Sequence, residues 1–209
     1  MMTDEQYVDS LYGEDEDLMR TKKGIADHGM PDISIADGYG RLLTMLVMTS
    51  GAKQLLEIGA LGGYSGICLA RGMGTEGHLT SLELKPEFAE VAMKHMKEAG
   101  FGDAVDYLLG DARESLAKLK EEGRRFDFFF IDADKEGYPI YLDYAIELSN
   151  PGAIIIGDNV LLRGRTTDPA RVGPAVQAVR SFNQRIAADD RLMSTVLPGY
   201  DGLAIAIVK

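Results

Sequence analysis

The fold class follows from the segment Leu55-Leu56-Glu57-Ile58-Gly59-Ala60-Leu61-Gly62-Gly63-Tyr64-Ser65-Gly66. An apolar run of strand length ends in a glycine-rich turn, and a helix is predicted to begin after Gly63. Glycines let a ligand approach the backbone closely, and the first amides of a helix attract a carboxylate or phosphate. Tight packing of strand against helix is the alternative explanation of these glycines, so the segment alone leaves a ligand site open.

Strand-like runs and helical stretches alternate along the chain that follows. Further helices are predicted over 86–99, 112–119 and 138–148, which is typical of a parallel sheet with helices on both faces. The last two strand-like runs are separated only by residues 198–202, so they are predicted to form an antiparallel hairpin. We therefore expect an α/β fold with a seven-stranded, mostly parallel sheet and a C-terminal hairpin. The predicted strands are residues 55–58, 78–82, 105–109, 126–131, 153–156, 194–197 and 203–208.

The whole chain, residues 1–209, is expected to form a single domain with covering helices within about the first 50 residues. A helical pattern extends from about Thr3 to Ala26, and a second apolar pattern passes through Leu42, Leu43, Leu46 and Val47. The sequence shows no internal repeat and no linker rich in proline, glycine or serine. Because the carboxyl ends of parallel strands meet at one edge of a sheet, a ligand crevice is expected there.

Composition excludes several classes of protein. Of 209 residues, 22 are Lys or Arg and 33 are Asp or Glu, which gives a net charge of −11 and argues against nucleic acid as a partner. The hydrophobic fraction of 45% is that of a globular protein and not of a disordered one. No apolar run reaches the roughly 20 residues that cross a membrane, and the acidic N-terminus is unlike a signal peptide, so we expect a cytoplasmic location and no membrane partner. The one cysteine, Cys68, lies in an apolar run and is predicted to be a small buried hydrophobe.

Acidic residues end the second and third predicted strands. Glu83 is in position to accept hydrogen bonds from ribose hydroxyls, although a solvated loop carboxylate is the alternative. Asp111 could accept a hydrogen bond from the amino group of adenine, or serve only as the N-cap of the next helix. The loop after Ile58 fits no register of the dinucleotide fingerprint G-x-G-x-x-G, which argues against a nicotinamide cofactor.

Carboxylates and an amide follow the fourth and fifth predicted strands. Asp132 comes directly after one strand, and Asp158 and Asn159 end the next. Such oxygen ligands suit Mg²⁺, Ca²⁺ or Mn²⁺, whereas turn and capping roles are the alternative. Lys135 lies three residues beyond Asp132, and a partly buried site beside a cation favours the neutral amine, which could act as a general base. The alternative for Lys135 is a solvated surface lysine.

The motifs 56–59 with 63–65, 130–135 and 157–160 together resemble those of the cation-dependent O-methyltransferases of the caffeoyl-CoA and catechol type, a group with a Rossmann-like methyltransferase fold. The similarity extends from about Tyr7 to the C-terminus. It implies S-adenosylmethionine as co-substrate, a divalent cation, most simply Mg²⁺, and a small aromatic acceptor with adjacent hydroxyls. It also implies a homodimer, in which the N-terminal helices could take part.

The resemblance also assigns roles to individual residues. It implies metal ligation by Asp132, Asp158 and Asn159 and catalysis by Lys135 and Asp132. The residues implied for cofactor binding are Glu57, Gly59, Gly63, Tyr64, Ser65, Glu83, Asp111, Ala112, Asp132 and Asp134.

The sequence departs from this family at two places. Gly62 replaces a usual threonine or similar residue in the cofactor loop, and Gly40-Arg41 replaces a usual Gly-Gln on the acceptor side. Two other functions compete with methyl transfer: a nicotinamide-dependent oxidoreductase and a non-catalytic nucleoside-binding protein. Arg163 and Arg165, which follow the expected metal ligands, could contact an anionic acceptor or simply be solvated.

Overall fold

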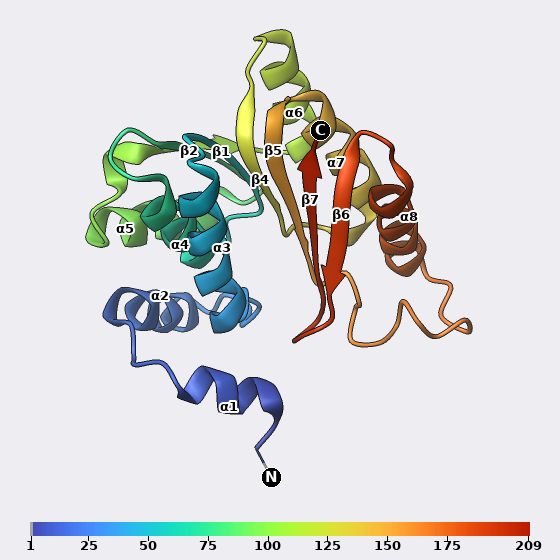
Figure 1. Cartoon of the computed structure of the whole chain (residues 1–209). Coiled ribbons are helices and arrows are strands. Elements are labelled where there is room, and N and C mark those ends of the chain that lie inside the picture. The colour runs from blue at the N-terminus through green and yellow to red at the C-terminus, as the bar shows by residue number, and fades with distance from the viewer. Residues whose placement is uncertain (1) are drawn as a thin grey trace.

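The computed structural model describes residues 2–209 and contains one seven-stranded sheet between two layers of helices (Figure 1). The strand order is β3-β2-β1-β4-β5-β7-β6. From β1 at the centre of the sheet, the chain proceeds toward one edge through β2 and β3. It then crosses to the other side of β1 and proceeds toward the opposite edge through β4 and β5. The strands are β1 (Gln54–Ile58), β2 (His78–Glu83), β3 (Val105–Leu109), β4 (Phe126–Ile131), β5 (Ser149–Asp158), β6 (Leu192–Leu197) and β7 (Leu203–Val208).

Strands β1 to β5 are parallel, and β1 pairs with both β2 and β4. The strand order therefore reverses direction at β1 and β4, and in open α/β sheets ligands bind outside the carboxyl ends of the strands at such a point. Strand β7 lies between β5 and β6 and runs antiparallel to both. The predicted fold class and the C-terminal hairpin are thus confirmed.

Two hydrophobic cores lie on opposite faces of the sheet, and β4 contributes to both. Phe128 and Phe130 point toward the layer of α3, α4 and α5, whereas Phe129 and Ile131 point toward α6, α7 and α8. All four side chains are fully buried, as predicted for a strand covered on both faces. Cys68 is buried in the first of these cores, which confirms its prediction as a buried hydrophobe.

The helices are α1 (Asp4–Ser10), α2 (Glu16–Asp27), α3 (Asp37–Ser50), α4 (Tyr64–Met73), α5 (Pro86–Glu98), α6 (Ala112–Glu121), α7 (Tyr138–Glu147) and α8 (Pro174–Ala188). Two short 3₁₀ turns precede β3 and α7, at Gly102–Ala104 and Lys135–Gly137. None of the helices in residues 2–209 combines the length and the apolar composition needed to cross a bilayer.

One helix prediction was wrong, and one helix was missed. The stretch from Thr3 to Ala26 is not one helix, because α1 ends near Leu11 and α2 begins anew after Asp15, whose carboxylate accepts a hydrogen bond from the Leu18 amide at 3.1 Å. Helix α8, between β5 and β6, was not predicted at all. Its signals are a proline in the first turn and a buried stripe of Val176, Val179, Phe182 and Ile186.

The turn after β1 passes directly over the end of β4. The Asp132 amide donates to the Ile58 carbonyl oxygen at 3.0 Å, and the Gly59 amide donates to the Leu82 carbonyl oxygen at 2.9 Å. Gly59 has φ +97°, and a Cβ at this position would lie 2.3 Å from the Asp132 carbonyl oxygen. Only glycine fits both the backbone angle and the close approach. The loops after β1 and β4 are therefore in contact.

Candidate active site

A cavity of about 790 Å³ opens at the carboxyl ends of the parallel strands, where the topology predicts a ligand site. Its wall is built from the loops that follow β1 to β5, together with the segment Asp32–Ile35 and Asp201. Ten of the residues predicted from the sequence line it: Gly59, Tyr64, Ser65, Glu83, Asp111, Ala112, Asp132, Asp134, Lys135 and Asn159. Three others, Glu57, Gly63 and Asp158, lie outside this lining.

Glu57 is fully buried beneath the glycine-rich loop. Its carboxylate accepts hydrogen bonds from the hydroxyls of Ser65 at 2.5 Å and Ser81 at 2.6 Å. Burial raises the pKa of Glu57 to about 7, although the two hydroxyl donors lower it, and the charges of Glu83 and Asp132 raise it further. Glu57 therefore orients Ser65 from behind, and Ser65 is the member of this pair that faces the cavity.

Glu83 shapes the same loop from the end of β2. One of its carboxylate oxygens accepts from the amides of Ala60 at 3.1 Å and Leu61 at 3.0 Å, and the other accepts from the Lys85 amide at 3.0 Å. The first oxygen already accepts two hydrogen bonds, but the second accepts one and keeps a free acceptor position, so Glu83 remains compatible with a contact to a ribose hydroxyl. Gly63 is the N-cap of α4, has φ +85° and provides no side-chain cap. The first amides of α4 can therefore receive an anionic group.

Asp111 and Asp134 stand at the ends of β3 and β4 on the same side of the cavity. Asp111 caps α6 by accepting from the Arg113 amide at 2.8 Å, which confirms the capping interpretation. Asp134 accepts from the Gly137 amide at 2.9 Å and from the Tyr141 hydroxyl. The guanidinium of Arg113 lies 3.6 Å from Asp134 and 3.9 Å from Asp111. Both carboxylates are thus fixed in position and face a cation within the protein.

Lys135 is held among polar groups from the ends of β4 and β5. Its Nζ donates to Asp132 at 2.9 Å and to the Tyr138 hydroxyl at 2.5 Å, and only 18% of its side chain is exposed. Tyr138 is fully buried and donates to the Asp158 carbonyl oxygen at 2.8 Å. Burial and the nearby acidic groups raise the pKa of Tyr138 well above its usual value, so the phenol stays protonated. The solvated-surface alternative for Lys135 is therefore excluded.

The predicted metal ligands provide a donor set of two carboxylates and one amide. Burial, the charge of Asp132 and a smaller effect of Asp201 raise the pKa of Asp158 to about 7, although the Asn159 amide and Lys135 lower it. The charges of Asp132 and Asp158 repel each other, and Lys135 offsets that repulsion only in part, so a divalent cation held by both carboxylates would relieve it. Asn159 adopts φ +55° and lines the cavity. The residues present therefore fit a hard cation. Residues 2–209 contain no cluster of three His, Cys, Asp or Glu side chains that could hold a metal ion. The predicted set differs from such a cluster, because its third ligand is the amide of Asn159.

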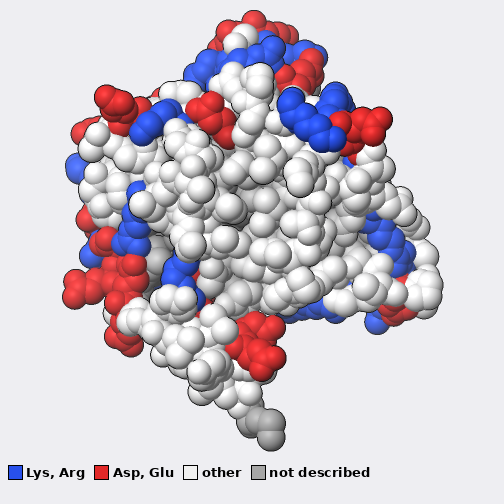
Figure 2. All heavy atoms as spheres, viewed as in Figure 1, with Lys and Arg blue, Asp and Glu red and all other residues white. Residues whose placement is uncertain are grey.

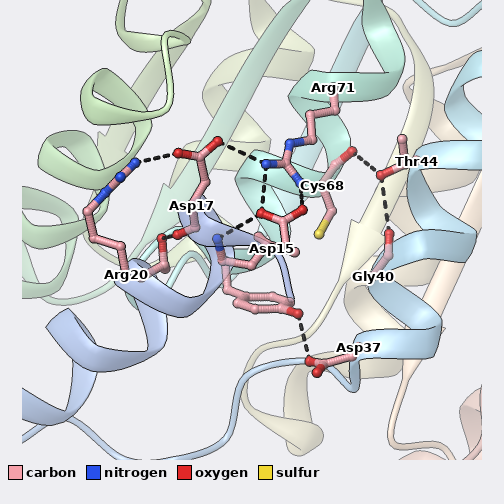
Figure 3. A network of polar contacts seen from close by, with 11 residues as sticks. Asp15, Asp17, Arg20, Asp37, Gly40, Thr44, Cys68 and Arg71 are labelled. Atoms are coloured by element: carbon pink, nitrogen blue, oxygen red, sulfur yellow. Dashed lines mark hydrogen bonds and ion pairs between the residues drawn. The ribbon is translucent and has the colours of Figure 1, made fainter. Parts of the chain in front are cut away.

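Polar contacts fasten α2 and the segment before α3 to the wall of the cavity (Figure 3). Arg71 of α4 contacts Asp15 at 2.5 Å and Asp17 at 2.9 Å. At the start of α3, the Asp37 carboxylate accepts from the Tyr64 hydroxyl at 2.7 Å and from Lys22 at 2.5 Å. Burial raises the pKa of Asp37, but these two donors outweigh it and hold the pKa below its usual value. Tyr64 therefore joins the start of α4 to the start of α3, and the segment Asp32–Ile35 just before α3 lines the cavity.

Sequence reasoning missed several of these residues. The predicted helices contain Tyr138, Tyr141 and Arg113, and their sequence context is typical of ordinary core or surface positions. Only their short spacing from Lys135 and Asp134 could have indicated a part in the site. The segment Asp32–Ile35 lies between two helices, and nothing in its sequence marks it as part of a ligand site. It is held beside the cavity by the hydrogen bonds of the neighbouring Asp37 to Tyr64 and Lys22, which are distant in the sequence.

Comparison with known proteins identifies the family. The sequence model of the O-methyltransferase family matches residues 8–209. A catechol O-methyltransferase of Niastella koreensis is 40% identical over 98% of this chain and 96% of its own length. A catechol O-methyltransferase of Mycobacterium tuberculosis is 36% identical over 97% of this chain and 94% of its own.

The chain belongs to the O-methyltransferase family. Solved structures agree with this assignment: the O-methyltransferase from Bacillus cereus in complex with SAH superposes with a TM-score of 0.92 at 40% identity, covering 98% of this chain and 96% of that one. TomG from Streptomyces achromogenes in complex with SAM gives a TM-score of 0.90 at 37% identity, covering 97% of this chain and 94% of that one. The expected enzyme class, an S-adenosylmethionine-dependent O-methyltransferase, and its Rossmann-like fold are confirmed.

The buried acid of this O-methyltransferase makes its stability depend on pH. Glu57 keeps its proton in the folded protein up to about pH 7, whereas the unfolded chain loses it near the ordinary value of 4.5. Its stabilising contribution is complete below about pH 4.5, declines as the pH rises and is lost above about pH 7. Replacing Glu57→Gln should reduce the fall in the free energy of unfolding between about pH 5 and about pH 8 by about 1–3 kcal/mol.

Urea unfolding of both proteins at the two pH values measures this difference. Glutamine keeps the size of the side chain and an acceptor for the serine hydroxyls. The matched control is Glu90→Gln, which alters an exposed glutamate on α5 and should leave the pH dependence as it was. An equal pH dependence in Glu57→Gln and the unaltered protein would contradict the assignment.

Proposed function

We propose that this enzyme transfers the methyl group of S-adenosylmethionine to a hydroxyl of a small aromatic molecule with two adjacent hydroxyls, with the help of a divalent cation. The observation that carries the proposal is the position of Lys135. Its amine donates hydrogen bonds to Asp132 and Tyr138, and the cavity that it lines also contains Ser65, Glu83 and Asp111. A candidate base and a set of nucleoside-binding residues thus share one space.

The cofactor side of the cavity suits S-adenosylmethionine. The free amides at the start of α4 and the Ser65 hydroxyl can receive its carboxylate. Glu83 can accept from a ribose hydroxyl, and Asp111 from the adenine amino group. The remaining acidic groups, Asp132 and Asp134, favour its positive sulfonium and amino groups. This assignment keeps Gly59, Gly63 and Ala112 as backbone contacts and gives Glu57 an indirect role through Ser65.

Asp132, Asp158 and Asn159 are the proposed ligands of the cation, with Mg²⁺ as the simplest choice and Ca²⁺ or Mn²⁺ as alternatives. When bound, the cation would lower the pKa of a hydroxyl that contacts it and neutralise the repulsion between the two carboxylates. Asp132 would then have two roles, because its Oδ1 also accepts the hydrogen bond from Lys135 at 2.9 Å.

Lys135 is the proposed general base. In its neutral form, Nζ takes the proton from the acceptor hydroxyl, and Asp132 and Tyr138 fix the direction of the amine during this transfer. The acceptor oxygen then bonds to the methyl carbon as the bond from that carbon to sulfur breaks, with the electron pair going to sulfur. The products are a methyl ether, S-adenosylhomocysteine and a protonated Lys135. Most of the acceleration comes from holding oxygen, methyl carbon and sulfur in line.

Formation of S-adenosylhomocysteine with catechol, measured with Mg²⁺ and with excess chelator, tests the proposal. Turnover should require both the acceptor and the cation. Asp132→Ala and Asp158→Ala should abolish metal-dependent turnover, and Lys135→Met should lower kcat by about 100-fold or more. Calorimetry should find binding of S-adenosylmethionine largely retained in all three variants.

Asp103→Ala, which removes an exposed carboxylate outside the cavity, is the matched control and should turn over normally. Equal turnover with Mg²⁺ and with excess chelator would refute the role of the cation. Binding of S-adenosylmethionine without consumption, with any of a panel of catechols, would favour the non-catalytic binding protein. Quenching or enhancement of NADH fluorescence would favour the oxidoreductase.

We also infer that two copies of the chain form a homodimer through the uncharged face at the centre of Figure 2. Helix α3 and strands β6 and β7 lie on this side of the molecule in Figure 1. Among the exposed apolar residues, Met45 and Met48 belong to α3, and Met193 and Ile207 belong to β6 and β7. Met193 and Ile207 are paired across the two strands, and 71% and 44% of their surfaces are exposed. A partner with a net charge of −11 can approach closely only where acidic groups are absent, as they are here.

Light scattering on a sizing column measures the mass in solution and should give twice the mass of one chain. Met193→Glu places a charge in the proposed interface and should shift the protein toward the monomer. Met93→Glu introduces the same charge at an exposed methionine of α5 and should leave the dimer intact. A monomeric unaltered protein would refute the dimer.

A further inference from the structure

The loop between β5 and α8 brings two arginines to the cavity. Leu162, Arg163 and Arg165 line the cavity together with Asn159, on the side away from the nucleoside-binding loops. Leu162 and Arg163 have φ values of +50° and +52°, and Gly164 follows at +79°. Two successive non-glycine residues in this region cost free energy, and such a backbone persists only where its surroundings hold it.

Arg180 of α8 supplies most of that support. Its guanidinium donates to four carbonyl oxygens of the loop: to Thr166 at 2.9 Å, Arg171 at 2.8 Å, Arg165 at 3.2 Å and Asp168 at 2.5 Å. On the other side, the Arg163 amide donates to the Asp201 carboxylate, and the Leu161 amide donates to the Asp201 carbonyl oxygen at 2.9 Å. The loop is therefore built into one conformation that carries Arg163 and Arg165 at the wall of the cavity.

The basic side chains around the cavity differ in whether they form ion pairs with carboxylates. Lys135 lies on Asp132, and Arg113 lies beside Asp111 and Asp134. By contrast, neither Arg163 nor Arg165 forms an ion pair with any carboxylate of the described residues, in a chain that contains 33 acidic residues. Arg165 uses its Nε on the Leu162 carbonyl oxygen at 2.9 Å, which leaves its two terminal nitrogens free to bind another group. Both arginines are exposed at the mouth of the cavity, and the nearby Asp201 carboxylate accepts its hydrogen bond from the Arg163 backbone amide, so both guanidinium groups remain available to an anion on this side.

We propose that Arg163 and Arg165 bind a carboxylate on the methyl acceptor, so that the preferred substrate is an aromatic carboxylic acid with two adjacent hydroxyls. Guanidinium groups match the planar carboxylate with paired hydrogen bonds. This inference rests on the proposed methyl transfer to adjacent hydroxyls and names the chemical class of the acceptor. A phosphate-bearing acceptor would use the same charge, and the experiment separates the two.

The test compares two acceptors that differ only in charge, 3,4-dihydroxybenzoate and 3,4-dihydroxybenzyl alcohol, with catechol as reference. We expect the unaltered enzyme to have a kcat/KM for the acid at least about tenfold above that for the alcohol. In the double variant Arg163→Gln, Arg165→Gln, this ratio should fall by about 10- to 100-fold, mainly through a higher KM for the acid. The caffeoyl thioester of coenzyme A serves as the phosphate-bearing acceptor and should not exceed the acid in kcat/KM.

Arg171→Gln is the matched control, because Arg171 belongs to the same loop but pairs with Asp168 and does not line the cavity. It should leave the ratio of acid to alcohol unchanged. A ratio near one in the unaltered enzyme, or an unchanged ratio in the double variant, overturns the inference while catechol turnover still supports the methyl transfer. A coenzyme A thioester that is preferred over the acid and loses its advantage in the double variant reassigns the arginines to phosphate. Failure of the unaltered enzyme on catechol and every other acceptor refutes the proposed function itself.

Discussion

The contact between the turn after β1 and the backbone at the end of β4 governs how this site is assembled. Gly59 lies so near the Asp132 carbonyl oxygen that a Cβ could not be accommodated, and its φ of +97° is one that residues with side chains rarely adopt. Because of this contact, the loop that would hold the cofactor and the loop that carries Lys135 form adjoining walls of one cavity. Methyl transfer needs the donor and the base within a few ångströms of one acceptor oxygen, and this junction provides that proximity.

Acidic groups buried near the junction give the site its electrostatic character. Glu57 and Asp158 both have pKa values raised to about 7, chiefly because burial disfavours the charged carboxylate. Serine hydroxyls stabilise Glu57 from the protein side, but Asp158 faces the carboxylate of Asp132 and is only partly compensated by Lys135. Hydrogen bonds from the protein thus satisfy the Glu57 carboxylate. Asp158 and Asp132, by contrast, would gain most from an added cation.

Much of the fold was predictable from the sequence, because alternating strands and helices and the short connection before β7 permit few topologies. Ten predicted site residues line the cavity because strand ends are determined locally and meet at one edge of a parallel sheet. The role of Glu57 was not predictable in this way, since its orientation toward Ser81 depends on the pairing of β1 with β2. Helix α8 was missed, and with it Arg180, whose bonds to the preceding loop depend on tertiary packing.

The proposed chemistry depends on a divalent cation bound at the ends of β4 and β5, beside the loops that would hold the cofactor. Diffraction from crystals grown with S-adenosylhomocysteine and Mn²⁺, recorded to detect the anomalous signal of manganese, tests it most directly. We expect one peak about 2–2.5 Å from oxygens of Asp132, Asp158 and Asn159, with the nucleoside next to Glu83. A peak elsewhere, or no peak while S-adenosylhomocysteine is bound, would contradict it.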